Sequence, residues 1–290
     1  MGSVAKVVVV GAGTMGSQIA LQCSVGGGHE VALVDSRPEA LEAAIEQNRR
    51  TLARSVERGR LTGQAASAAL DRIHPSSDPT AAARDADIAI EAVFEDLEAK
   101  REVFRTLDAA LPEASLLTSN SSSIPISSLA AVTSRPDRCC NTHFFHPVTV
   151  MELCEVVMGP ETSEATVERA MEFVRGIGRI PVLLRKEIHG FIVNRILFAA
   201  SLEAMRLLEG GYATVEDIDL AVKKGLNWPM GIFELLDFSG VDVFVGALED
   251  RARVEGGEGA PQLLKEMVRR GELGRKSGRG FHDYRPSVAP

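Results

Sequence analysis

The chain lacks the features that would place it in a membrane, on a nucleic acid or around a metal ion. No apolar run approaches the roughly 18–20 residues that a membrane-spanning helix needs. Acidic residues outnumber basic ones by 40 to 32, the formal charge is −8 and there is no long basic block, so we expect no nucleic-acid partner. The cysteines have neither metal-ligand spacing nor the pattern of a disulfide framework; they are Cys23, Cys139, Cys140 and Cys154. We therefore expect no bound metal, and reduced core thiols in a cytoplasmic protein.

Targeting signals are also missing from the first residues. Because a strand is predicted almost at once, we expect no secretory signal. Met1-Gly2 would suit myristoylation, but Lys6 stands where Ser or Thr is required. No internal repeat or low-complexity segment is evident. The 290 residues, of which 45% are hydrophobic, suffice for one large or two ordinary domains.

What the sequence does contain is a glycine motif between two apolar segments. Val7–Val10 leads into Gly11-Ala-Gly13-Thr-Met-Gly16, which opens a helical pattern. The first glycine permits a tight turn, the second lets a pyrophosphate approach the backbone, and the third lets the helix pack on the strand. Asp35 ends the next apolar segment, where an acid meets the ribose hydroxyls. The motif predicts a dinucleotide site, and Asp35 favours NAD over NADP.

Strands and helices alternate through the first part of the chain. The expected strands are Val7–Val10, Val31–Val34, Ile88–Val93, Leu116–Thr118, Val156-Val157 and Ile180–Leu184. The expected helices between them cover 39–58, a stretch capped by Thr62, 97–111 and 163–177. This alternation predicts an α/β fold with a mostly parallel, doubly wound sheet of the Rossmann type. The helix pair between Arg37 and Leu70 is longer than such a unit requires and indicates a helical-hairpin insertion.

After about Glu187 the pattern is purely helical. Apolar residues recur at helical spacing from Gly190 to Leu208, Thr214 is a candidate N-cap, and residues 235–248 and 261–268 supply further helix. We therefore divide the chain into a dinucleotide-binding domain, residues 1–187, and an all-helical domain for substrate binding and dimerisation, residues 188–290. The wide apolar surface of the helical domain predicts a homodimer.

One short segment offers the groups that alcohol oxidation requires. Such a reaction needs a base that titrates near neutrality and a group that holds this base in one tautomer. His143 and Glu155, twelve residues apart, can supply a base and its orienting acid. On spacing alone, His146 and Glu152 compete for the same two roles.

Taken together, the motifs resemble those of the 3-hydroxyacyl-CoA dehydrogenase family, close to the bacterial 3-hydroxybutyryl-CoA dehydrogenases. Besides the glycine motif, the matching segments are 91–100, 119–123, 143–148, 190–195, 229–237 and 278–281. The resemblance covers nearly the whole chain. It implies an NAD-dependent oxidoreductase that interconverts a 3-hydroxyacyl thioester and its 3-oxoacyl form.

The resemblance also implies roles for individual residues. His143 matches the catalytic base and Glu155 the acid that orients it. Ser122 matches a serine that hydrogen-bonds the substrate oxygen, and Asn194 an active-site asparagine from the helical domain. The residues expected to bind NAD are Gly11, Gly13, Thr14, Met15, Gly16, Asp35, Glu95, Lys100 and Asn120. The residues expected to contact substrate are Ser122, His146 and Asn194.

The chain departs from the family pattern at five positions, where the family usually has Asn, Pro, Lys, Thr and Tyr. These positions are His146, Thr149, Glu152, Ser121 and His282, in that order. The first departure matters most, because an imidazole at the edge of the active site changes the size and the hydrogen-bond donors there. Three alternatives therefore stay open. They are a dehydrogenase of a free hydroxy acid resembling gulonate or carnitine, one acting on a hydroxyacyl group on an acyl carrier protein, and a non-catalytic dinucleotide-binding protein. The retained catalytic set argues against the last of these.

Overall fold

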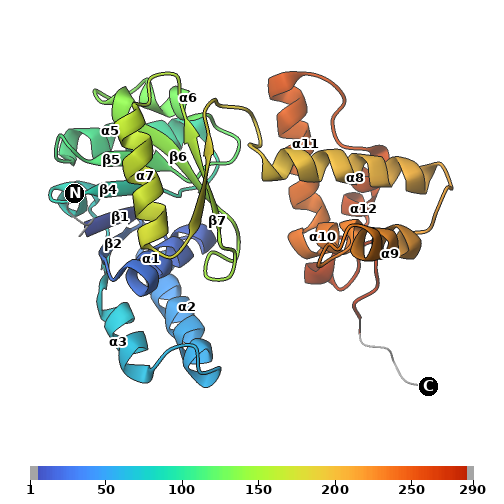
Figure 1. Ribbon diagram of the computed structural model, residues 1–290, viewed down its shortest axis with the longest axis horizontal. Coiled ribbons are helices and arrows are strands. Elements are labelled where there is room, and N and C mark those ends of the chain that lie inside the picture. The colour runs from blue at the N-terminus through green and yellow to red at the C-terminus, as the bar shows by residue number, and fades with distance from the viewer. Residues whose placement is uncertain (1–5, 286–290) are drawn as a thin grey trace. The chain divides into compact units, whose positions relative to one another are not determined.

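The computed structural model describes residues 6–285, and tertiary contacts divide the chain into two compact units, Met1–Ile188 and His189–Pro290 (Figure 1). Among the described residues, no helix combines the length and the apolar character needed to cross a membrane.

The first unit is built on an eight-stranded sheet with the strand order β3-β2-β1-β4-β5-β6-β7-β8. The strands are β1 (Lys6–Val10), β2 (Glu30–Val34), β3 (Ile73–Ser76), β4 (Ile88–Glu91), β5 (Leu116–Ser119), β6 (Cys139–Phe144), β7 (Leu153–Met158) and β8 (Ile180–Leu184). Strands β1 to β6 pair in parallel, β7 runs antiparallel to β6, and β8 is parallel to β7. The expected doubly wound, mostly parallel sheet is confirmed.

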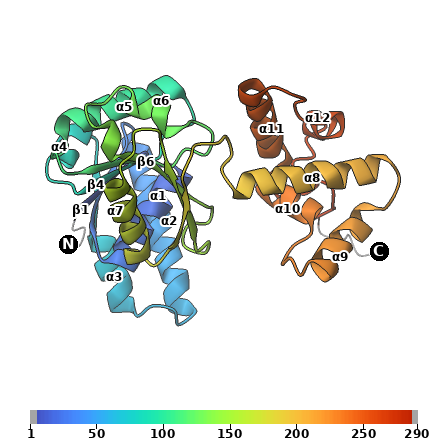
Figure 2. The same cartoon turned by 45° about the horizontal axis from the view of Figure 1, so that its top comes forward.

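Helices cover both faces of this sheet (Figures 1 and 2). Side chains alternate along β1, so that Val7 and Val9 pack into one core while Val8 and Val10 pack into the other. The helices on the first face are α1 (Thr14–Gly27), α2 (Pro38–Glu57), α3 (Gly63–Asp71) and α7 (Glu164–Gly176). Those on the second face are α4 (Pro79–Ala83), α5 (Leu97–Ala110) and α6 (Ile126–Ala130).

The predicted hairpin insertion is present as α2 and α3. Thr62 is the N-cap of α3, where its side chain accepts a hydrogen bond from the Ala65 N–H at 3.1 Å. Leu41, Ala44 and Leu52 of α2 are buried in the same core as α1, so the hairpin is packed against the sheet rather than merely solvated.

The second unit is helical, as predicted. Its helices are α8 (Val193–Glu209), α9 (Val215–Gly225), α10 (Ile232–Ser239), α11 (Val241–Glu255) and α12 (Gln262–Arg269). They enclose one core, to which Phe198, Met205, Phe233 and Leu264 contribute. Thr214 caps α9 by accepting a hydrogen bond from the Asp217 N–H at 3.1 Å.

The structure departs from the expectations in three places that bear on the site or the helical unit. Residues 235–248 form parts of two helices, because Gly240 has a φ of +101° and breaks the chain direction between α10 and α11. Helix α8 begins at Val193 rather than Gly190, since Phe191 has a φ of +51°. Two strands, β3 and β6, were not among the expected strands, and β6 contains His143.

Candidate active site

The glycine motif forms an open cradle between β1 and α1. Gly11 has a φ of +105°, and a Cβ there would lie 2.5 Å from the Ala92 carbonyl oxygen. A Cβ on Gly16 would lie 1.8 Å from the Gly11 carbonyl oxygen, so the close packing of helix on strand requires glycine. A Cβ on Gly13 would have no atom within 4 Å. The strand and helix therefore need glycines at the first and third positions, and the second faces open space.

Helix α1 begins at this opening without a side-chain cap. Gly13 is its N-cap, and both Gly13 and Thr14 are exposed. The first N–H groups of a helix have no partner within the helix, and the helix dipole favours negative charge there. Thr14, Met15 and Gly16 thus supply backbone N–H groups suited to a pyrophosphate.

Asp35 stands at the carboxyl end of β2, beside the cradle. Its Oδ2 accepts a hydrogen bond from the Ala12 N–H at 2.9 Å, and its Oδ1 accepts from the Arg37 N–H at 3.0 Å. Partial burial acts to raise the pKa of Asp35, but these N–H groups and the Arg37 guanidinium outweigh it and hold the pKa below its ordinary value. Asp35 is therefore a fixed, ionised carboxylate beside the glycine motif.

His143 and Glu155 face each other across the antiparallel pair β6 and β7. They are register partners, and the His143 Nδ1 lies 2.8 Å from the Glu155 Oε2. Their side chains are 9% and 1% exposed. The Phe145 ring stands edge-on to the imidazole, with the ring centroids 4.5 Å apart. Because a carboxylate can only accept, the neutral ring carries its proton on Nδ1 and keeps the Nε2 lone pair for another proton.

The competing residues lie elsewhere. His146 is exposed, and so is Glu152, which precedes β7. Between the two candidate acids, the structure brings Glu155 to His143. The reversal of direction between β6 and β7 is what turns a separation of twelve residues into a direct contact.

The serine motif, residues 119–123, begins at the last residue of β5 and is tied to the neighbouring strand β6. Asn120 Oδ1 accepts a hydrogen bond from the Phe144 N–H at 2.9 Å, and the Asn141 side chain donates to the Ser121 carbonyl at 3.3 Å. Ser122 is half-buried at this carboxyl end of the sheet. The Asn120 Oδ1 therefore helps to hold the carboxyl ends of β5 and β6 together.

Beneath the serine motif lies a buried charged network. Lys100 is 1% exposed, and its Nζ lies 2.7 Å from Glu91 Oε1, 3.1 Å from Glu95 Oε2 and 3.1 Å from the Val93 carbonyl oxygen. An ammonium group has three donors, and these acceptors match them. Glu95 also accepts hydrogen bonds from the Ser121 and Ser123 hydroxyls. Lys100 is therefore the buried member of its ion pair with Glu95, and Glu95, whose side chain is 42% exposed, is the member that reaches solvent.

Glu91 belongs to this network but was not among the site residues expected from the sequence. It is the last residue of β4 and fully buried, and its Oε2 accepts a hydrogen bond from the Ser119 hydroxyl at 2.6 Å. Burial raises its pKa, while Lys100, Ser119 and the Val93 N–H act to lower it. An acid closing an otherwise apolar strand is the signal that would have singled it out.

Comparisons with known proteins decide the family. Residues 6–188 match the family model for the NAD binding domain of 3-hydroxyacyl-CoA dehydrogenase, and residues 190–284 match the model for its C-terminal domain. The chain belongs to the 3-hydroxyacyl-CoA dehydrogenase family. As in its family, the first domain binds NAD, and the protein is an NAD-dependent oxidoreductase of this type.

Three relatives illustrate the range of likeness. A probable 3-hydroxybutyryl-CoA dehydrogenase of Bacillus subtilis is 40% identical over 284 residues, which cover 96% of this chain and 97% of that protein. The (S)-3-hydroxybutyryl-CoA dehydrogenase PaaH1 of Ralstonia eutropha superposes with a TM-score of 0.91 at 37% identity, covering 98% of this chain and 100% of that one. A diketoreductase that acts on dicarbonyl compounds superposes with a TM-score of 0.85 at 31% identity, covering 98% and 100%.

Within the family's C-terminal domain, Asn194 is the second residue of α8 and half-buried. Its expected role toward the substrate stays a prediction.

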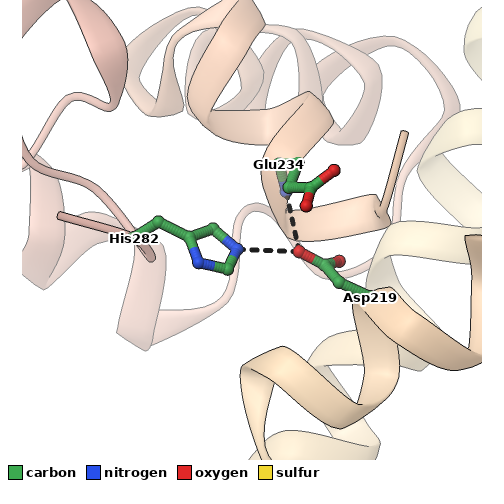
Figure 3. Close-up of side chains that lie close together, drawn as sticks. All are labelled: Asp219, Glu234 and His282. Carbon is green, nitrogen blue, oxygen red and sulfur yellow. Dashed lines mark hydrogen bonds and ion pairs between the residues drawn. The ribbon is translucent and has the colours of Figure 1, made fainter. Parts of the chain in front are cut away.

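The helical unit also brings together Asp219, Glu234 and His282 (Figure 3). The oxygen and nitrogen atoms that could bind a metal ion already have hydrogen-bond or ion-pair partners. Asp219 accepts hydrogen bonds from the Phe233 and Glu234 N–H groups at 2.8 and 3.1 Å, which caps α10 from the neighbouring helix α9. His282 Nε2 lies 2.8 Å from Asp219 Oδ2, and Glu234 pairs with Lys223. These contacts account for the cluster as a helix cap that fastens the C-terminal segment.

Proposed function

We propose that the protein oxidises a 3-hydroxyacyl-CoA thioester to the 3-oxoacyl form, and catalyses the reverse reduction, with His143 as general base and general acid. The observation that supports this most directly is the 2.8 Å contact between His143 Nδ1 and Glu155 Oε2. A buried acid beside the histidine is the arrangement that fixes an imidazole tautomer and stabilises its protonated form.

The chemistry follows from that tautomer. Glu155 holds the proton on Nδ1, so Nε2 accepts the hydroxyl proton of the substrate as the carbon–oxygen double bond forms. Bound NAD would supply the hydride acceptor for the carbon that bears this hydroxyl. The resulting imidazolium is stabilised by the Glu155 carboxylate. In the reverse direction the imidazolium returns its proton to the oxygen of the reduced carbonyl.

The remaining residues bind and orient. Ser122, at the end of β5, is proposed to donate a hydrogen bond to the substrate oxygen, and Asn194 to complete the site from the helical domain. On the cofactor side, the uncapped start of α1 receives the pyrophosphate and Asp35 the adenine ribose. Lys100 keeps Glu95 ionised and in place, and Glu95 is the member of that pair with an exposed surface for the cofactor.

Two features leave the substrate class open to a second candidate. His146 stands where the family usually has asparagine, and one relative of 31% identity is a diketoreductase. A free hydroxy acid or dicarbonyl compound, or a hydroxyacyl group on an acyl carrier protein, is therefore the alternative substrate. We also infer a homodimer formed through the helical unit, because Ile192, Ile196, Leu207 and Leu220 expose apolar surface there. The cytoplasmic location stays a prediction.

A substrate panel followed by NADH absorbance tests the proposal. The panel contains 3-hydroxybutyryl-CoA, the same acyl group on an acyl carrier protein, free 3-hydroxybutyrate, gulonate and carnitine. We expect the highest kcat/KM with the CoA thioester. A higher value with a free acid would establish the alternative, and no turnover of any compound, with NAD binding intact, would support a non-catalytic protein.

A further inference from the structure

Gln18 joins the cofactor-binding helix to the segment that follows the His143 strand. It lies on α1, just beyond the glycine motif, and is half-buried. Its Oε1 lies 2.8 Å from the Val148 N atom, and its Nε2 lies 3.4 Å from His146 Nδ1. His146 itself is exposed at the carboxyl end of β6. One side chain thus contacts both the backbone and the imidazole of this segment.

The directions of these two hydrogen bonds follow from the atoms involved. A backbone N–H can only donate, so the Gln18 carbonyl oxygen must be its acceptor. The Gln18 amide nitrogen then faces His146, and an amide –NH₂ can only donate. The His146 Nδ1 must therefore accept. A neutral imidazole carries one proton, so that proton lies on Nε2. We propose that Gln18 is a positioning residue that selects this tautomer of His146 and leaves Nε2–H as the ring's only donor; its use toward a substrate rests on the proposed function.

The orientation of Gln18 is imposed by the backbone and not by the histidine. The Val148 carbonyl accepts a hydrogen bond from Arg179 Nε at 3.0 Å, and the same guanidinium donates to Gln22, one turn further along α1. Gln22 in turn donates to the Ile177 carbonyl at 2.6 Å. Val148 is thus fixed through both of its backbone polar groups. Its N–H presents a donor to Gln18 whatever the protonation state of His146.

This selection changes what the site can recognise. An asparagine at position 146, the usual family residue, would offer both a donor and an acceptor. The Gln18–His146 pair offers a donor alone, so it complements an acceptor such as a carbonyl, carboxylate or phosphate oxygen and disfavours a group that can only donate, such as an ammonium. A substrate group that reaches His146 is therefore expected to contact it through an acceptor oxygen.

Nitrogen-15 NMR of histidine-labelled protein tests the assignment directly, at a pH where the His146 ring is neutral. The His146→Asn variant identifies the signals. In the unmodified protein we expect Nε2 to carry the proton. In Gln18→Glu, whose carboxylate can only accept, we expect the proton on Nδ1 of the neutral ring or a persistent imidazolium. Gln64→Glu, at an exposed position on α3, is the matched control for the added charge and should leave the His146 signals unchanged.

The outcomes separate cleanly. A proton on Nδ1 in the unmodified protein, or one retained on Nε2 in Gln18→Glu, would overturn the proposal. If Gln18→Glu fails to fold, Gln18→Met takes its place and should populate both tautomers; a ring unchanged in Gln18→Met would count against Gln18 equally. The spectra need no turnover, so the result is independent of the dehydrogenase assignment.

Discussion

Lys100 and Glu91 form an ion pair that is closed to solvent on both sides, with Nζ 2.7 Å from Oε1 and side-chain exposures of 1% and 0%. Two charges removed from water are costly unless their other polar atoms are satisfied. The Ser119 hydroxyl and the Val93 N–H donate hydrogen bonds to the Glu91 carboxylate. The Lys100 ammonium also contacts the Val93 carbonyl and the Glu95 carboxylate. The pair is therefore a rigid support beneath the serine motif.

Removing one partner of this pair should destabilise the fold strongly. We expect Lys100→Met to lower the free energy of unfolding by about 3–5 kcal/mol, because it leaves a buried carboxylate without its counter-charge. Adding Glu91→Gln to it should restore part of the loss. Urea denaturation measures both. Arg105→Met, at a half-exposed position on the same helix, should change stability by less than about 0.5 kcal/mol. An equal loss of unfolding free energy in Lys100→Met and in the double variant would contradict an energetic coupling between Lys100 and Glu91.

The stabilising contribution of Glu95 should depend on pH. Burial acts to raise its pKa, but Lys100 and the serine hydroxyls outweigh burial and lower the pKa below 4.5. A carboxyl group with a lowered folded-state pKa stabilises the fold above its unfolded pKa and loses this effect as the pH falls through its folded value. The difference in Tm between the wild type and Glu95→Gln should thus be largest near neutrality and shrink below about pH 4.5. A difference that grows on acidification would refute this sign.

Asp35 should decide between NAD and NADP. Its carboxylate is held ionised by the Ala12 and Arg37 N–H groups and would repel a 2′-phosphate. We expect a clear preference of kcat/KM for NAD, and Asp35→Ala should reduce this preference, because the exposed Arg37 guanidinium remains nearby. Steady-state kinetics with both cofactors measure the ratio. Comparable kcat/KM values with NAD and NADP in the unmodified enzyme would rule out Asp35 as the residue that selects NAD.

Loss of the base should slow the chemical step and spare cofactor binding. We expect His143→Gln to reduce kcat by about 10²–10⁴-fold, the usual contribution of a general base. Glu155→Gln should lower kcat as well, because the imidazolium loses its counter-charge. NADH binding, followed by fluorescence, should survive in both. If His143→Gln kept full activity and His146→Ala abolished it, the base would be the other histidine.

The four cysteines should be unreactive in the native protein. All are buried and free. Burial raises the pKa of Cys23 and Cys139 to about 12, and it also raises the pKa of Cys140 and Cys154. The thiolate is the reactive form, so a disulfide reagent at pH 8 should label native protein slowly and label all four thiols in denaturant. Rapid labelling of the native form would show that these residues are accessible.

The parts of the molecule that sequence reasoning predicted are those governed by local rules. The glycine motif and Asp35 lie within thirty residues of each other, and their roles follow from turn geometry and helix packing. Thr62 and Thr214 could be named as caps because capping involves a side chain and the helix that starts beside it. The alternating pattern then sufficed for the parallel sheet and the helical second unit.

What could not be predicted depends on contacts between distant segments. Strand β6 reads as polar, Cys-Cys-Asn-Thr-His-Phe, yet all six residues are buried because strands flank it on both sides. The pairing of Glu91 with Lys100 required β4 and α5 to be placed, and that of Gln18 with His146 required the placement of α1 and of the segment that follows β6. The break at Gly240 was hidden because the apolar pattern continues through it.

Asp237 has a consequence for the order in which the chain folds. This carboxylate is 1% exposed on α10, and it accepts hydrogen bonds from the Phe281 and His282 N–H groups and the Tyr284 hydroxyl. All three donors lie more than forty residues further along the chain. During synthesis the ribosome therefore delivers α10 well before the groups that satisfy its buried charge. The helical unit cannot reach its final packing until Tyr284 has emerged, so the nucleotide-binding unit has time to fold first.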